Sequence, residues 1–270
     1  MQTVFLVMLF VFGACLGSFL CCQARRLHLK TAKPKTKNML GPRSICLSCH
    51  HQLKWYDNLP IISWLFLGGK CRYCHRKIGS AEILSELGLG LSFLSLGTTI
   101  DITANSPITW CGFAILLIFT SIVGFLAVYD GLYGELPAVF LYLAITIATA
   151  SLIVREISTL STTPFTAATI LDSLFSILIL GGVYLALYLI SRGKWVGDGD
   201  WLLATAIAIT LSHPWLAINT LFIANLIACM VALPLVKGKK SRLIHLGPFL
   251  VIGFVIVYSA SGFLFGLIGV

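Results

Sequence analysis

The sequence predicts an all-α polytopic membrane protein with about eight transmembrane helices. Hydrophobic residues make up 58% of the 270 residues and only 11% are charged, and the mean hydropathy is +0.95. An ordinary soluble domain carries about a quarter charged residues, so this composition excludes a water-soluble globular protein. Long apolar runs also recur along nearly the whole chain, and runs of about 18 or more uncharged residues are typical of membrane-spanning helices.

The first apolar run covers residues 1–24 and has no basic residues before it. A cleaved secretory signal needs such a basic start, so we interpret this run as a retained signal anchor. Arg25 and Arg26 follow it directly, which predicts that the amino terminus lies outside the cell and the next segment in the cytosol.

The remaining predicted spans follow a long polar segment. They cover residues 81–100, 108–129, 137–154, 168–191, 201–212, 215–236 and 246–269. With this topology, 18 of the 19 Lys and Arg residues fall in cytosolic segments, and Arg155 is the exception. Such segregation supports the eight-span topology and explains the net charge of +9 without a nucleic-acid partner. Run 201–212 is short, so we expect it to borrow residues from Trp195 onward, to tilt, or to lie buried as a partial helix.

The polar segment divides the chain into three predicted parts. Residues 1–24 form the first transmembrane helix, residues 25–80 a cytosolic insert, and residues 81–270 a membrane domain of about seven helices. Within the insert, residues 25–45 are a basic linker that we expect near anionic membrane lipids. A compact cysteine module follows.

The module contains two C-x-x-C pairs, Cys46 with Cys49 and Cys71 with Cys74, separated by 21 residues. Each pair can direct two sulfurs at one point, and two pairs complete a tetrahedral zinc site. The gap slightly exceeds the usual spacing of about 15–20 residues. Four thiolates leave no position for water, so we expect a structural zinc ion whose binding energy folds a segment too short for its own core. Redox disulfides and a site without metal are the alternatives.

Two aspartates lie where apolar runs meet the cytosolic side. Asp130 ends the run 108–129, where a carboxylate faces the negative end of the helix dipole, and this unfavourable placement suggests function. Asp200 closes Gly197-Asp198-Gly199-Asp200 at the start of a run, where an aspartate also serves as a helix cap. Glycines there allow close backbone approach. Two adjacent carboxylates share a proton, so one can act as a base for water and the other as an acid toward a carbonyl.

Three further acidic residues have open roles. Glu82 and Glu86 lie four residues apart and share one helical face, where they either solvate an interface or form part of a polar site. Asp172 lies early in the fifth span, near the outer face, where it is either a functional intramembrane acid or a residue that reaches water.

Together these segments resemble one known family, the prepilin peptidases or type IV leader peptidases, which are GxGD-type intramembrane aspartic proteases. The resemblance covers nearly the whole chain. Its motifs are Gly17-Ser18-Phe19-Leu20, the insert RSICLSCHHQLKWYDNLPIISWLFLGGKCRYCHRKI, Asp130 with Leu136-Pro137, Gly197-Asp198-Gly199-Asp200, and HLGPFL at residues 245–250.

The resemblance implies a multi-pass enzyme of the inner cell membrane that serves type IV pilus assembly and protein secretion. It would remove the short basic leader from prepilins and pseudopilins, with Asp130 and Asp200 as the catalytic pair in the membrane domain. The cysteine insert would bind zinc. This insert is often associated with members that also N-methylate the new amino terminus, using S-adenosylmethionine.

The chain departs from the family pattern at four places, and these departures weaken the expectation of methylation. They are Cys21, Ala81-Glu82-Ile83, Ala138 and Leu202, whereas Glu86 matches the family's glutamate.

We expect substrate positioning to come from the motif residues around the aspartates, because the chain's own basic loops would repel a basic leader. Glu135 and Asp198 are the candidates to hold leader Lys or Arg, and the other positioning candidates are Gly197, Gly199 and Glu86. A proton-coupled transporter or channel using Asp130 and Asp200 is the alternative, although the border position of both aspartates disfavours it. A thiol oxidoreductase rests on the C-x-x-C pairs alone.

Overall fold

A computed structural model describes residues 1–31, 44–46, 48–102, 106–159, 167–236, 245–262 and 264. Within these ranges the chain is helical, with two isolated β-bridges and no strand, so the predicted all-α class is confirmed. The chain divides into two compact units, Met1–Leu94 and Ser95–Val270. The predicted boundaries at residues 24 and 80 stay a prediction.

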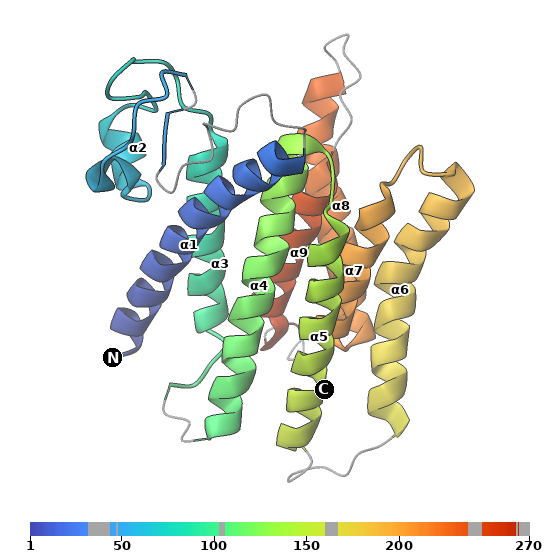
Figure 1. Cartoon of the computed structure of the whole chain (residues 1–270). Coiled ribbons are helices and arrows are strands. Elements are labelled where there is room, and N and C mark those ends of the chain that lie inside the picture. Colours follow the sequence, from blue (N-terminus) through green and yellow to red (C-terminus); the bar gives the residue numbers. More distant parts are fainter. Residues whose placement is uncertain are drawn as a thin grey trace. The chain divides into compact units, whose positions relative to one another are not determined.

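The first unit is built on two antiparallel helices, α1 (Gln2–Thr31) and α3 (Ala81–Gly97) (Figure 1). Their backbones touch at glycines. A Cβ atom on Gly13 would lie 2.7 Å from the carbonyl oxygen of Leu89, and one on Gly17 would overlap the carbonyl oxygen of Ser85. Small residues that allow such close approach are typical of helix pairs in membranes.

The cysteine module lies between α1 and α3 in the chain. It contains the 3₁₀ helix η2 (Trp55–Asn58) and the short helix α2 (Ile62–Phe66). An ion pair between Arg25 of α1 and Glu82 of α3 joins the two long helices at the end that adjoins the module. Most of the predicted basic linker, residues 32–43, lies outside the described residues.

The described part of the second unit contains six helices that lie wholly within it (Figure 1). They are α4 (Pro107–Tyr133), α5 (Ala138–Thr159), α6 (Ala167–Ser191), α7 (Asp198–Leu211), α8 (Pro214–Val236) and α9 (Gly247–Ser259). Each overlaps one of the predicted apolar runs, although α9 is much shorter than the predicted run 246–269. The carboxyl end of α4 meets the amino ends of α7 and α9, since Gly247 bonds to Asp130 and Gly199 contacts Leu136.

Helix α7 is the buried centre of this unit. Its 14 residues span only about 21 Å, against a hydrocarbon core of about 30 Å. It packs against α5, α6 and α9, and its buried residues include Leu203, Ala204, Ile207 and Leu211. Of the three possibilities that the sequence left for run 201–212, the structure shows the buried partial helix.

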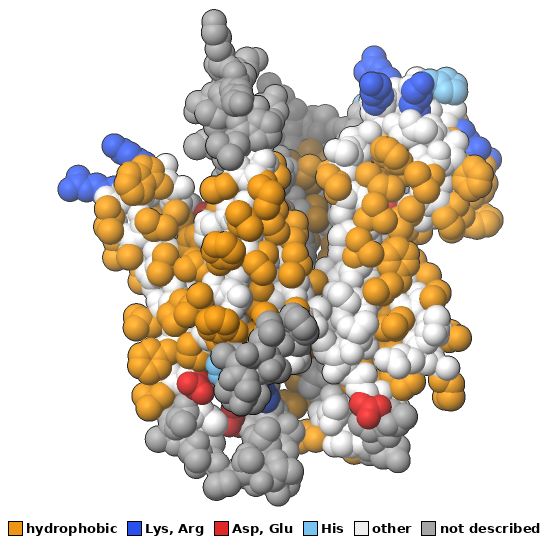
Figure 2. Space-filling view, turned by 180° about the vertical axis from the view of Figure 1, so that it is seen from behind, with side chains coloured by type: hydrophobic (Ala, Val, Ile, Leu, Met, Phe, Trp, Pro, Cys, Tyr) orange, Lys and Arg blue, Asp and Glu red, His pale blue; other side chains and the backbone are white. Residues whose placement is uncertain are grey.

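Among the described residues, five helices are long and apolar enough to cross a membrane, which supports a multi-pass membrane protein. They are Gln2–Thr31, Pro107–Tyr133, Ala138–Ile157, Thr169–Ser191 and Pro214–Ala232. Helices α3, α7 and α9 have 17, 14 and 13 residues, so the count of eight spans stays a prediction. Each of the five long helices exposes large apolar side chains. Hydrophobic side chains also cover much of the surface seen in Figure 2.

We expect Gly17→Val to separate α1 from α3, because its Cβ would overlap the Ser85 carbonyl oxygen and lie 2.9 Å from Glu86 Cα. Overpacking costs about 1–3 kcal/mol even where side chains can move, and here the neighbours are backbone atoms. The free energy of unfolding in detergent measures this loss.

Gly88→Ala, in the same helix pair, is the matched control. A Cβ on Gly88 meets nothing within 4 Å, so this change should leave stability equal or raise it by up to about 1 kcal/mol. Equal stability of the Gly17 and Gly88 variants would contradict the close helix contact.

Candidate active site and cysteine cluster

Asp130 lies in the last turn of α4, and its side chain is bonded to the start of another helix. The backbone amide of Gly247 donates to its Oδ2 atom at 3.0 Å, and the residue is only 5% exposed. Gly247 is the first residue of α9, where unpaired amides and the positive end of the helix dipole favour a carboxylate. The dipole of α9 therefore offsets the unfavourable position of Asp130 on its own helix.

Two glycines make this contact possible. A Cβ on Gly247 would lie 2.8 Å from Asp130 Oδ2, so a larger residue would force the carboxylate away. Gly134 ends α4 with a φ of 69°, and its amide bonds the carbonyl oxygen of Asp130. A Cβ on Gly134 would also lie 2.7 Å from His245 Cε1. Both positions need glycine because another group occupies the space of a side chain.

Asp200 lies in the first turn of α7 and accepts a hydrogen bond from the amide of Gly197 at 2.9 Å. Gly197 is the residue that caps the helix, and Asp200 reaches back to it from the third helical position. The aspartate is 7% exposed. Asp200 thus caps the amino end of α7, as the sequence suggested. Its carboxylate also lies near the carboxyl end of α4.

Gly199 joins the two aspartate motifs. A Cβ on this residue would lie 2.5 Å from Leu136 Cβ, so the turn that carries Asp200 packs directly against the segment that follows α4. The G-x-G-D pattern can therefore be explained by packing, since Gly197 donates to the aspartate and Gly199 allows the close approach.

His245 lies beside the first aspartate, with its Nδ1 atom 3.7 Å from Asp130 Oδ1. The Asp200 carboxylate lies close enough to Asp130 to act on it electrostatically. The sequence motifs include His245 only as part of a matching segment and predict no role for it. The available signal is its place directly before the predicted span 246–269, which starts at the same end as the aspartates.

The other predicted positioning residues lie in different places. Glu135 and Asp198 flank the two aspartates in sequence, and both are exposed. Glu86 belongs to the first unit, where it is 6% exposed and accepts a hydrogen bond from the amide of Ile61 at 2.7 Å. Ile61 has a φ of 64°, a conformation that is unfavourable for a β-branched residue, so Glu86 holds a strained turn of the cysteine module.

The cysteine pairs form two similar turns. In each, the residue after the second cysteine is a histidine with positive φ, 57° for His50 and 55° for His75. The amide of each histidine bonds the carbonyl oxygen of the first cysteine, Cys46 or Cys71, at 2.9 and 3.0 Å. A short antiparallel bridge closes each turn, Ile45 with Gln52 and Lys70 with Lys77.

The four sulfur atoms converge on one point. Those of Cys46, Cys49, Cys71 and Cys74 lie within 4.8 Å of one another, and Cys46 and Cys74 are 3.9 Å apart. Tetrahedral zinc with Zn–S bonds of about 2.3 Å separates its sulfurs by about 3.8 Å. Partial burial opposes ionisation of Cys46, but backbone hydrogen bonds from Cys49 and Ser48 outweigh it and lower its pKa to about 7. The cluster can thus hold a metal ion.

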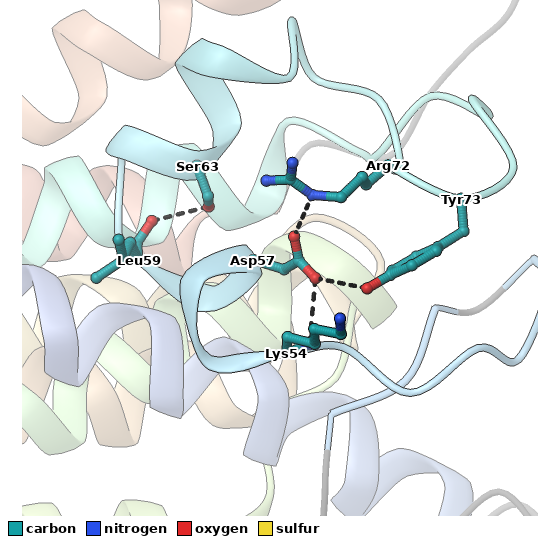
Figure 3. Close-up of polar contacts among 6 residues, drawn as sticks. All are labelled: Lys54, Asp57, Leu59, Ser63, Arg72 and Tyr73. Atoms are coloured by element: carbon teal, nitrogen blue, oxygen red, sulfur yellow. Dashed lines mark hydrogen bonds and ion pairs between the residues drawn. The ribbon is translucent and has the colours of Figure 1, made fainter.

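Asp57 fastens the second cysteine turn to the rest of the module (Figure 3). Its carboxylate accepts hydrogen bonds from Arg72 Nε at 2.7 Å, the amide of Lys54 at 3.1 Å and the hydroxyl of Tyr73 at 3.2 Å. Burial opposes its charge, but these hydrogen bonds and the Arg72 guanidinium hold the pKa of Asp57 below its usual range. Arg72 and Tyr73 are the two residues between Cys71 and Cys74, so Asp57 orients that pair.

Comparison with known proteins gives one consistent family. The model of the bacterial peptidase A24 amino-terminal domain matches residues 11–100. A prepilin leader peptidase/N-methyltransferase of Dichelobacter nodosus is 28% identical over 86% of this chain and 78% of its own length. The protein of that name from Aeromonas salmonicida is 26% identical over 91% and 87%.

A third protein of the same name, from Myxococcus xanthus, is 42% identical over 91 residues, which are 34% of this chain and 25% of that protein. No solved structure matches the chain. The family model covers most of the first unit, and the two longer alignments cover both units, so the chain is similar to prepilin leader peptidases along most of its length.

Proposed function

We propose that this protein is a membrane aspartic endopeptidase that removes the short basic leader from type IV prepilins and pseudopilins. The observation that carries the proposal is the proximity of the Asp130 and Asp200 carboxylates at one end of the second unit, where His245 Nδ1 lies 3.7 Å from Asp130 Oδ1. The names of the relatives support the substrate class. Neither the family model nor the relatives support the transporter alternative.

In the proposed mechanism, the two carboxylates share one proton. The ionised aspartate takes a proton from water, whose oxygen bonds to the scissile carbonyl carbon, while the other aspartate protonates the carbonyl oxygen. The C–N bond then breaks as the first aspartate passes the water proton to the leaving amine, and the second aspartate recovers its proton from the intermediate's hydroxyl as the carbonyl re-forms. The Gly247 amide and His245 hold Asp130 in place, and the Gly197 amide holds Asp200.

The site lies at helix ends, which matches the shape of the proposed substrate. A prepilin has a basic leader followed by an apolar helix, so its cleavage point lies at a membrane border. We place this border at the cytosolic face of the inner membrane, with the amino terminus outside, because the Lys and Arg residues gather in the loops of that side.

The cysteine cluster holds structural zinc in this proposal, since four thiolates close a tetrahedral site. The relatives also carry N-methyltransferase in their names. We extend this second activity to the present chain, with S-adenosylmethionine as the donor that supplies the methyl group to the new amino terminus.

Asp130→Asn and Asp200→Asn should each lower leader cleavage about a hundredfold or more, because positioned acid–base groups contribute about 10²–10⁴-fold. Cleavage of a prepilin with a basic leader in proteoliposomes is the measurement, with the product amino terminus read by mass spectrometry. Asp172→Asn is the matched control, since Asp172 lies at the opposite end of α6 from the site. Full-rate cleavage by either site variant would rule out the aspartate pair.

Glu135→Gln with Asp198→Asn should selectively weaken cleavage of basic leaders. Exposed charge pairs contribute about 0.2–1 kcal/mol each, so we expect a fall of about two- to fivefold per acid in kcat/KM at low salt. A prepilin whose leader Lys and Arg are replaced by Gln serves as the comparison substrate. Undiminished cleavage of the basic leader by the double variant would remove this role.

Cys71→Ser should abolish metal binding and unfold the module, because Cys71 is the buried member of the cluster and metal binding supplies its folding energy. Elemental analysis of the purified protein should fall from one zinc per chain to none, and protease sensitivity within residues 44–80 should rise. Cys111→Ser, at an exposed cysteine of α4, should keep the zinc. Retained zinc in Cys71→Ser would contradict a four-cysteine site.

A further inference from the structure

A cavity of about 310 Å³ lies within the first unit, between the cysteine module and the adjoining ends of α1 and α3. This volume is at the lower end of the range for small-molecule sites. Arg25 and Glu82 line it from the two helices, and Trp64 lines it from α2. Cys46 and Cys71 of the metal cluster also reach its wall, so the cavity depends on a folded module.

Three buried polar atoms of these lining residues have no hydrogen-bond partner. They are Arg25 Nε, Trp64 Nε1 and Glu82 Oε2. Buried polar atoms are rarely left unpaired in folded proteins, and an unpaired one costs about 1–3 kcal/mol. Three such atoms, all on residues that line one cavity, leave hydrogen bonds that a bound molecule can complete.

The other acids of the cavity wall are already engaged. Asp57 is bonded to Arg72, Lys54 and Tyr73, and Glu86 to the amide of Ile61. Glu82 has one oxygen paired with Arg25 and one oxygen open. Beside that open oxygen lies Gly79, whose side-chain position, 3.5 Å from it, is empty. The unpaired set is therefore two N–H donors and one carboxylate acceptor.

Two unpaired N–H donors and one unpaired carboxylate oxygen favour a ligand that carries both a hydrogen-bond acceptor and a hydrogen-bond donor at one end. An α-amino-acid group meets the requirement, because its carboxylate accepts from Arg25 and Trp64 while its ammonium donates to Glu82. A basic leader peptide would instead bring Lys or Arg side chains against a wall that already carries Arg25, Arg76 and Lys77, and like charges repel. S-adenosylmethionine, the donor of the methyltransferase activity proposed above, carries such a group on its methionyl end.

We propose that this cavity binds S-adenosylmethionine, with the methionyl carboxylate at Arg25 and Trp64 and the methionyl ammonium at Glu82. The inference rests on the proposed second activity, and it assigns that activity's cofactor site to the first unit. Since the module walls the cavity, loss of the metal should also abolish binding of the methyl donor.

Calorimetry on the full-length protein in detergent tests the site without measuring catalysis. S-adenosylhomocysteine is the probe, because it keeps the amino-acid group. Trp64→Phe keeps the aromatic ring and removes the N–H, and Glu82→Gln removes the charge. Each should weaken binding about tenfold, as expected when one buried hydrogen bond is lost.

Two controls separate this result from a general structural effect. Trp55→Phe changes an exposed tryptophan of the same module and should leave the Kd unchanged. The second ligand, 5′-methylthioadenosine, lacks the amino-acid group, so Trp64→Phe and Glu82→Gln should not weaken its binding.

Three results would overturn the inference. They are absence of S-adenosylhomocysteine binding by the wild type, an equal Kd in the wild type and both cavity variants, or equal losses for both ligands. Leader cleavage by the same wild-type preparation is measured beside the binding. A preparation that cleaves prepilin but binds no donor would overturn this site alone, whereas one that does neither would also contradict the proposed peptidase.

Discussion

The hydrogen bond from the Gly247 amide to Asp130 is the interaction on which the candidate active site depends. It connects the end of α4 to the start of α9 and holds a buried carboxylate at the positive end of a helix dipole. A carboxylate buried without such partners would cost several kcal/mol. The bond therefore stabilises the negative charge and fixes where that charge lies relative to Asp200 and His245.

Close backbone approach is the second constraint, and glycines satisfy it in both units. Gly199 brings the first turn of α7 against Leu136, and Gly247 admits the Asp130 carboxylate. In the first unit, Gly13 and Gly17 let α1 touch the backbone of α3. In the second unit, close backbone approach brings the polar residues of the candidate site together. In the first unit it joins α1 and α3, whose ends enclose a cavity together with the module.

The cysteine module combines metal-ligand geometry with a network of charged groups. Its two turns repeat the same backbone pattern around Cys46 and Cys71, and Asp57 binds both residues between the second pair. Glu86 of α3 holds the strained turn at Ile61. This hydrogen bond fixes the module against α3. The cavity with the unpaired polar atoms lies between the module and the helix pair.

Hydrophobic runs and C-x-x-C spacing are local patterns, so they were enough to predict the helical class, the approximate position of each apolar helix and the cysteine tetrad. The sequence also marked Asp130 and Asp200 as candidates at one membrane border. It missed His245, Gly247 and the Trp64 cavity, and it left three readings open for run 201–212. Only the tertiary structure decided these points, because each depends on which backbone atoms come into contact between segments far apart in the chain.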